Sequence, residues 1–136
     1  MSKFAGSAID HVGLGVSDIS HAQAFYEPAL RPLGIELLMS IKADPPASTP
    51  RRLGFGSEGK PFLWLHAALP PSHGTHIALI AESRDAVDAF YAAAIAAGGQ
   101  DNGAPGIRRH YHPSYYAAYV LGPEGVNLEA VCQLTA

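Results

Sequence analysis

An internal repeat restricts the fold of this chain more than any other feature of its sequence. The segment THIALIAESRDAVDAFY (residues 75–91) repeats the pattern of DHVGLGVSDISHAQAFY (residues 10–26). In both copies a histidine, His11 or His76, leads a short apolar run, and a Phe-Tyr pair begins 14 residues after it. Self-similarity at a fixed spacing indicates repeated structural units. The sequence therefore predicts two copies of one module.

Hydrophobic periodicity gives the same order of elements in both modules. An alternating apolar run predicts a strand, and a helix follows that begins after a serine or aspartate cap and ends at a glycine. Pro28 is expected to bend the first helix. The predicted elements of the first module are strand 9–16, helix 19–33 and strands 35–41, 51–55 and 61–67. Those of the second are strand 75–81, helix 85–97, a short extended piece near residue 100, a Gly/Pro loop, and strands 115–121 and 126–133.

The fold class that follows is α+β, with two paired βαβββ modules. A one-sided sheet of this size needs a partner layer, so we expect the modules to pair into one open, cup-shaped mixed sheet with both helices on its outer face. The two modules that pair belong either to one chain or to two chains that exchange them. Residues 1–136 are predicted to form a single domain, with one module at about 8–68 and the other at about 74–134. The open face of the cup is the expected place for chemistry.

Composition narrows the classes of function. A hydrophobic fraction of 48% with 15% charged residues is typical of a globular protein with a packed core. The net charge of −3 and the scattered basic residues argue against a nucleic-acid partner. No apolar run approaches the roughly 18 residues that span a bilayer, so no membrane partner is expected. The single cysteine, Cys132, and a start without an apolar leader favour the cytoplasm.

The repeat also predicts a metal site. His11 and His76 fall on the open face of the first strand of each module, and Glu129 lies 53 residues after His76 on the open face of the last strand. The position 53 residues after His11 is Trp64. Two imidazoles and one carboxylate suit a divalent transition ion, namely Fe, Mn, Zn, Ni or Co. The alternative is that these are solvated side chains on a wet strand face.

The motifs IDHVGLGVSD, AFYEPALRPLG, HIALIAES, AFYAAAIAAGG and YVLGPEGVNLEAV together resemble the vicinal oxygen chelate superfamily. This superfamily holds glyoxalase I, bleomycin-resistance, fosfomycin-resistance and extradiol dioxygenase proteins. The resemblance implies paired βαβββ modules and a metal at the positions of His11, His76 and Glu129. In glyoxalase I the position of Trp64 is usually a carboxylate ligand, and its absence argues against lactoylglutathione lyase activity. The turn Gly122 to Gly125 replaces the family's Asp-Pro-Asp-Gly, a change expected to alter only the turn.

Further residues are predicted to surround the metal. The resemblance to extradiol dioxygenases implies a tyrosine at the position of Tyr119 that borders the ion. A loop rich in rings and arginines supplies His110 and His112, which we assign with Tyr119 to proton transfer. Aromatic cross-strand packing and a solvated surface loop are the simpler explanations. The predicted substrate pocket consists of Phe62, Trp64, His66, Arg109 and Tyr115.

Two functions compete at this point. The first is a metal-dependent enzyme that chelates a small substrate through two adjacent oxygens, with dioxygenase-like or lyase/transferase-like chemistry at a three-ligand site. The second is a metal-free binding protein of the bleomycin-resistance type, in which aromatic walls sequester a ligand. A module that serves mainly as a dimer partner is a third possibility, and exposed sheet edges favour a homodimer.

Overall fold

The computed structural model describes residues 8–42 and 50–135 of the 136-residue chain. The chain start and the turn-rich stretch 43–49 lie outside the described residues. The first module contains β1 (Val12–Gly15), α1 (Ile19–Leu30), the 3-10 turn η1 (Arg31–Leu33), β2 (Glu36–Lys42), β3 (Pro50–Ser57) and β4 (Lys60–His66). The second contains β5 (His76–Ile80), α2 (Arg84–Ala96), β6 (Gln100–Ile107), β7 (Tyr116–Leu121), the 3-10 turn η2 (Pro123–Gly125) and β8 (Asn127–Cys132).

Both modules have the same sheet topology, as the repeat predicts. The strand orders are β1-β4-β3-β2 and β5-β8-β7-β6. In each sheet the first and last strands of the module pair in parallel, and the other pairs are antiparallel. The α+β class and the paired βαβββ modules are therefore confirmed. The strands form two separate four-stranded sheets, because β1 and β5 share no ladder of hydrogen bonds.

The helices begin where the sequence predicts. The Asp18 side chain accepts a hydrogen bond from the His21 backbone amide, and Ser83 caps α2 in the same way through the Ala86 amide. Such caps satisfy donors that the first helical turn leaves free. Pro28 lies inside α1, which continues past it to Leu30.

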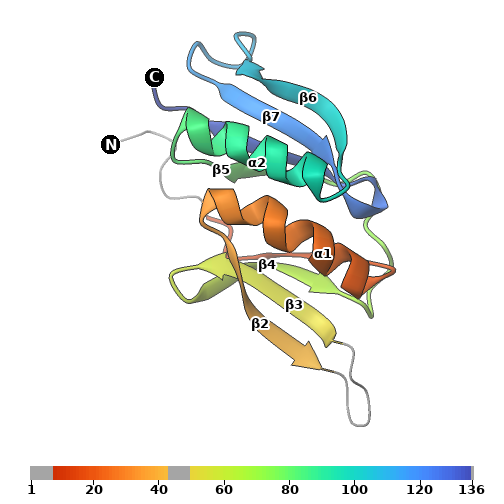
Figure 1. The fold of residues 1–136 in the computed structure, drawn as a ribbon. Coiled ribbons are helices and arrows are strands. Elements are labelled where there is room, and N and C mark those ends of the chain that lie inside the picture. The colour runs from red at the N-terminus through yellow and green to blue at the C-terminus, as the bar shows by residue number, and fades with distance from the viewer. Residues whose placement is uncertain (1–7, 43–49, 136) are drawn as a thin grey trace.

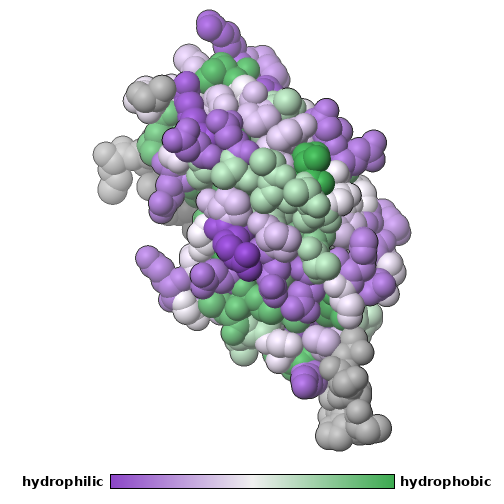
Figure 2. Space-filling model, in the orientation of Figure 1, coloured by the Kyte–Doolittle hydropathy of each residue, from purple (hydrophilic) through white to green (hydrophobic). Residues whose placement is uncertain are grey.

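One hydrophobic core joins the two modules. The helices lie side by side in front of both sheets, α1 over the first and α2 over the second (Figure 1). Phe25, Tyr26 and Phe90 are at most 2% exposed and belong to the same core cluster as Leu63 and Leu128 of the sheets. On the outer surface, the green of hydrophobic residues lies along α2 (Figure 2), where alanines such as Ala92 are exposed. No helix within the described residues has the length and apolar character needed to cross a bilayer.

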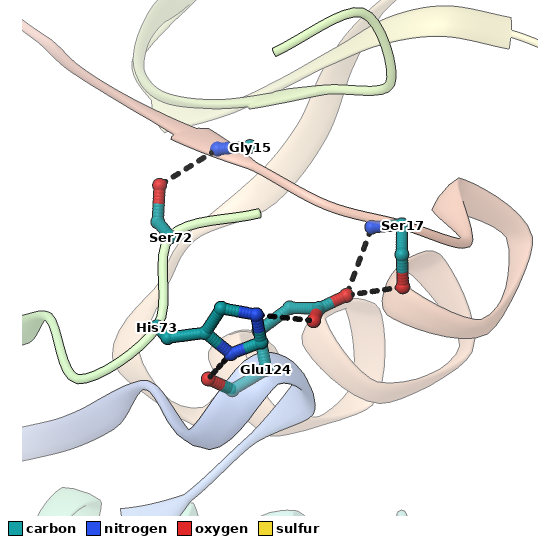
Figure 3. Close-up of polar contacts among 5 residues, drawn as sticks. All are labelled: Gly15, Ser17, Ser72, His73 and Glu124. Atoms are coloured by element: carbon teal, nitrogen blue, oxygen red, sulfur yellow. Dashed lines mark hydrogen bonds and ion pairs between the residues drawn. The ribbon is translucent and has the colours of Figure 1, made fainter. Parts of the chain in front are cut away.

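Polar contacts also connect the modules, as Figure 3 shows. The Glu124 carboxylate in η2 accepts two hydrogen bonds from Ser17 just before α1, from the backbone amide at 2.8 Å and from the hydroxyl at 2.5 Å. Nδ1 of His73 lies 3.2 Å from the Glu124 carbonyl oxygen. Glu124 has a left-handed backbone (φ 64°), unusual for a residue with a side chain. The sequence predicts only a turn at residues 122–125, whereas in the structure the acidic side chain of Glu124 in this turn reaches the other module.

Strand β6 differs from the prediction. The sequence indicates a Gly/Pro loop after residue 100, but residues Gln100–Ile107 pair with β7. The pairing is irregular, with register shifts on both sides of Gly103. Because β6 is an edge strand, Pro105 does not interrupt a ladder on both sides. The residues of this strand are extended but do not alternate between apolar and polar side chains. Hydrophobic periodicity therefore does not predict the strand.

Candidate functional site

Glu129, on β8, is the one charged residue that is buried within residues 8–42 and 50–135, with 1% exposure. Nε2 of His76 lies 2.8 Å from its Oε1 atom. The hydroxyl of Tyr115 donates to its Oε2 atom at 2.5 Å. A buried carboxylate is costly unless both oxygens find partners. The two contacts therefore hold the carboxylate in one orientation on the open face of the second sheet.

Three neighbouring strands place these side chains. Strands β5 and β8 are parallel with Ala78 beside Glu129, so His76 lies two residues away on the same face. Tyr119 of β7 is the direct antiparallel partner of Glu129. Tyr115 precedes Tyr119 by four residues and therefore shares its face. The three residues His76, Tyr119 and Glu129 therefore lie on one face of the second sheet.

Both tyrosines are held in their protonated form. Partial burial, followed by the charge of Glu129, raises the pKa of Tyr119 to about 12. Burial and the hydrogen bond to Glu129 raise the pKa of Tyr115 further above its ordinary value near 10. At neutral pH both hydroxyls therefore keep a proton. Each can donate a hydrogen bond to a ligand oxygen or a proton to a reacting atom, and neither acts as a resting base.

A row of rings extends from this centre to the turn between β6 and β7. The ring centroids of His76 and Tyr119 are 6.3 Å apart, those of Tyr115 and Tyr111 are 5.0 Å apart, and those of Tyr111 and His110 are 4.0 Å apart. Such offset contacts stabilise aromatic side chains beyond the area they bury. The row forms an aromatic wall on one side of the cup.

The arginine that reaches this wall is Arg108. Its guanidinium carbon lies 5.3 Å from the centroid of the Tyr119 ring, and its Nη2 donates to the carbonyl oxygen of Ala104 at 2.7 Å. Gly103 makes room for both groups, because a Cβ there would lie 2.8 Å from the Tyr119 ring and 3.2 Å from Arg108 Nη2. Arg109, the residue assigned to the pocket from the sequence, is exposed.

His110 and His112 lie at the far end of the row. His110 is exposed beside Tyr111, and His112 accepts a hydrogen bond at Nδ1 from the Ser114 amide. Within the described chain neither has a hydrogen bond to Glu129 or His76. Their assignment to proton transfer stays a prediction. Tyr115, which the sequence assigns to the substrate pocket, is the tyrosine that bonds to the carboxylate.

His11 has a different surrounding from His76. Its Nδ1 lies 2.6 Å from Oδ1 of Asp10, and Lys60 donates to the other oxygen of the same carboxylate at 2.5 Å. These hydrogen bonds, with the charge of Lys60, hold the pKa of Asp10 below its usual range. His11 borders a hollow of about 410 Å³ between the modules, which residues 77–80 of β5 also line.

The remaining predicted pocket residues alternate along β4. Phe62, Trp64 and His66 share the open face of the first sheet, while Leu63 and Leu65 between them are fully buried. Glycines leave room for the larger rings: a Cβ at Gly54 would lie 2.8 Å from the Trp64 ring, and one at Gly13 would lie 3.0 Å from Nε2 of His66. Both rings therefore lie close against the sheet.

His76 and Glu129 fit a divalent ion as two of its ligands. An imidazole nitrogen and a carboxylate oxygen 2.8 Å apart are donors that transition ions accept. A third protein donor does not stand beside them, since no group of three or more His, Cys, Asp or Glu residues gathers for a metal in the described parts of the chain. The donor pair is thus present, and His11 lies apart from it.

Comparison with known proteins decides the family. The model of the Glyoxalase/Bleomycin resistance protein/Dioxygenase superfamily matches residues 8–130, which is nearly the whole chain. The chain belongs to this superfamily. No curated protein sequence matches it.

Solved structures of the superfamily agree with this assignment. A glyoxalase/bleomycin resistance protein from Albidiferax ferrireducens T118 is 28% identical with a TM-score of 0.75, over 93% of this chain and 99% of that one. A family enzyme from Burkholderia phytofirmans PsJN is 21% identical with a TM-score of 0.64, over 94% and 100% of the two chains. An E144Q mutant of glyoxalase I from Zea mays is 21% identical with a TM-score of 0.63, over 90% of this chain and 46% of that one. The last two likenesses concern the fold alone.

Proposed function

We propose that this superfamily member is a divalent-metal-dependent enzyme that acts on a small molecule through two adjacent oxygens of its substrate. One observation supports this most strongly: the carboxylate of Glu129 is buried in the second sheet with an imidazole on one oxygen and a phenol on the other. A purely structural sheet position would favour an apolar side chain, because burying a carboxylate is costly.

His76 and Glu129 would hold the ion, and we propose His11 as its third protein ligand. Because His11 lies apart from this pair in the single chain, it would come from a second copy of the chain or from a rearrangement of the two modules. When bound, a divalent ion supplies Lewis acidity to the oxygens of the substrate. The chain contributes the surrounding chemistry. Tyr115 fixes the orientation of Glu129, while Tyr119 holds a proton at its phenolic oxygen that it can donate. Arg108 lies against the Tyr119 ring and adds positive charge to the wall.

The three-ligand set favours dioxygenase-like or lyase/transferase-like chemistry over that of glyoxalase I. The resemblance to glyoxalase I implies that Trp64 stands at the position of that enzyme's fourth, carboxylate ligand. An indole ring is no metal ligand, and here it lies close over Gly54. A three-ligand site leaves more coordination positions for the substrate and a second reactant.

Metal content in a set of variants tests this proposal. Protein prepared without a histidine tag and loaded with Zn²⁺ or Fe²⁺ is dialysed, and elemental analysis gives the metal bound per chain. We expect about one equivalent in the wild type and in His21→Ala, a control on the exposed face of α1, and less than a tenth of this in His76→Ala and Glu129→Gln. His11→Ala is expected to retain metal weakly. Equal retention by all variants would contradict the proposal.

A metal-free binding protein is the second candidate. The aromatic wall of Tyr111, Tyr115 and Tyr119 and the open-face ring of Trp64 favour it, as does the separation of His11 from the His76–Glu129 pair. In that case the wild type would retain no metal after loading, and aromatic compounds would quench the fluorescence of Trp64, the single tryptophan. The homodimer predicted from the sequence applies to both candidates and stays a prediction.

A further inference from the structure

A second hollow, distinct from the His76–Glu129 centre, lies at one end of the first sheet. We name it the basic hollow after Lys42, Arg51, Arg52 and His66. Its volume is about 370 Å³. The residues that line it are Ile41, Lys42, Arg51, Arg52, His66, Ala68 and Leu69.

Strand register explains why three of the lining residues, Ile41, Arg52 and His66, lie side by side. Arg52 of β3 is the direct cross-strand partner of both Ile41 of β2 and His66 of β4. Cross-strand partners point to the same face of a sheet, and His66 shares its face with Trp64 two residues earlier. The row Ile41, Arg52 and His66 therefore lies on the open face. The backbone amide of Ala67 bonds to the Arg51 carbonyl, which continues the pairing next to the hollow.

The charged residues that line the basic hollow are all positive. Three permanent cations and an imidazole line it, and no aspartate or glutamate is among the described lining residues. Within the described residues, neither Lys42, Arg51 nor Arg52 forms an ion pair, whereas Lys60 at the other end of β4 is paired with Asp10. The whole chain carries a net charge of −3, so this accumulation of positive charge is local.

Two side chains of the hollow are partly fixed in place. The guanidinium carbon of Arg52 lies 5.9 Å from the centroid of the Trp64 ring, within the range of a cation–π contact. The His66 ring lies close over Gly13. Partial burial and the charge of Arg52 lower the pKa of His66. Fixed donors lose less conformational freedom when they bind a ligand.

We propose that the basic hollow is a binding site for an oxyanion, the phosphate or carboxylate group of a small molecule. Guanidinium groups match such anions with paired hydrogen bonds, and Lys42 adds a further donor. A volume near 370 Å³ lies at the lower end of ordinary ligand sites and accommodates such a group with some of the molecule attached. Ile41 and Leu69 supply apolar contacts for that attached part. This site does not depend on the metal or the reaction proposed for the other centre.

Nuclear magnetic resonance titration of ¹⁵N-labelled protein tests the site with two probes, inorganic phosphate and acetate, at constant ionic strength. We expect saturable shifts confined to amides of the basic hollow, including Ile41, Ala68 and Leu69. Saturation by phosphate but not by acetate would assign a phosphate site, and the reverse a carboxylate site. No saturable shift with either anion would overturn the proposal.

Substitutions of single arginines test whether the anion binds in the basic hollow. Arg52→Gln is expected to weaken binding about tenfold or more, because it removes a charge-assisted contact. Arg51→Gln is a second variant, expected to act in the same direction. Arg31→Gln, which removes the same charge from a different hollow, is the matched control and should bind as the wild type. Equal losses in Arg31→Gln and Arg52→Gln would show a general charge effect and overturn the proposal.

Discussion

At the scale of residues, Glu129 and its partners determine what the second sheet can do. Alternation along each strand, together with the register that puts Tyr119 opposite Glu129, places His76, Tyr119 and Glu129 on one face. It does not predict which phenol bonds to the carboxylate. That choice depends on side-chain rotamers and on the exit of the chain from the turn before β7, and the structure gives the bond to Tyr115.

The bond between Tyr115 and Glu129 leads to a first prediction at this scale. Tyr115→Phe removes the hydroxyl and leaves one oxygen of a buried carboxylate without its donor. We expect a loss of about 1–3 kcal/mol in the free energy of unfolding, measured by urea denaturation. Tyr111→Phe is the control, because Tyr111 is exposed, and should change stability by less than about 0.5 kcal/mol. Equal stability of Tyr115→Phe and the wild type would show that the bond contributes little.

At the scale of elements, alternation and caps predict most helices and strands within a few residues of their observed ends. The exceptions have physical reasons. Residues 100–107 carry glycines and a proline without alternation, and they form β6 only because β7 offers a regular edge for pairing. The first helix ends as an α-helix at Leu30 and continues as the 3-10 turn η1, a tightening that a helical pattern does not distinguish.

The prediction at this scale concerns the contact between Glu124 in η2 and Ser17 just before α1. The hydrogen bonds from Ser17 lower the pKa of Glu124 below its usual value near 4.5. A carboxyl group with a lowered pKa stabilises the folded state above the unfolded pKa, and this contribution is lost as pH falls through the folded value. Glu124→Gln should therefore be less stable than the wild type at pH 7. Its stability should also fall less between about pH 5 and pH 3.

Urea denaturation at a series of pH values checks this expectation. Glu36→Gln is the matched control, because Glu36 is exposed and its carboxylate has no hydrogen bond or ion pair among the described residues. Its stability should follow that of the wild type at each pH. Parallel curves for Glu124→Gln and the wild type would show that the contact with Ser17 does not link the modules energetically.

At the scale of the whole molecule, the repeat predicts two βαβββ modules with the same order of elements, and the modules are confirmed. The repeat does not predict how close the equivalent histidines come. His76 meets Glu129 within its own module through the parallel pairing of β5 and β8, whereas the position of His11 depends on how one module lies against the other. Three features set how one module lies against the other: the contacts between the helices, the shared core and the Ser17–Glu124 hydrogen bonds. None of them has a periodic pattern in the sequence.

The central claim is that both modules contribute an imidazole to one metal centre. X-ray absorption spectroscopy of the zinc-loaded protein measures this directly, because outer-shell scattering reports the number of imidazole ligands. We predict two imidazoles in the wild type and one in His11→Ala, with the remaining ligands oxygen. One imidazole in both proteins would limit the centre to the second module, and a shell without imidazole would contradict the account.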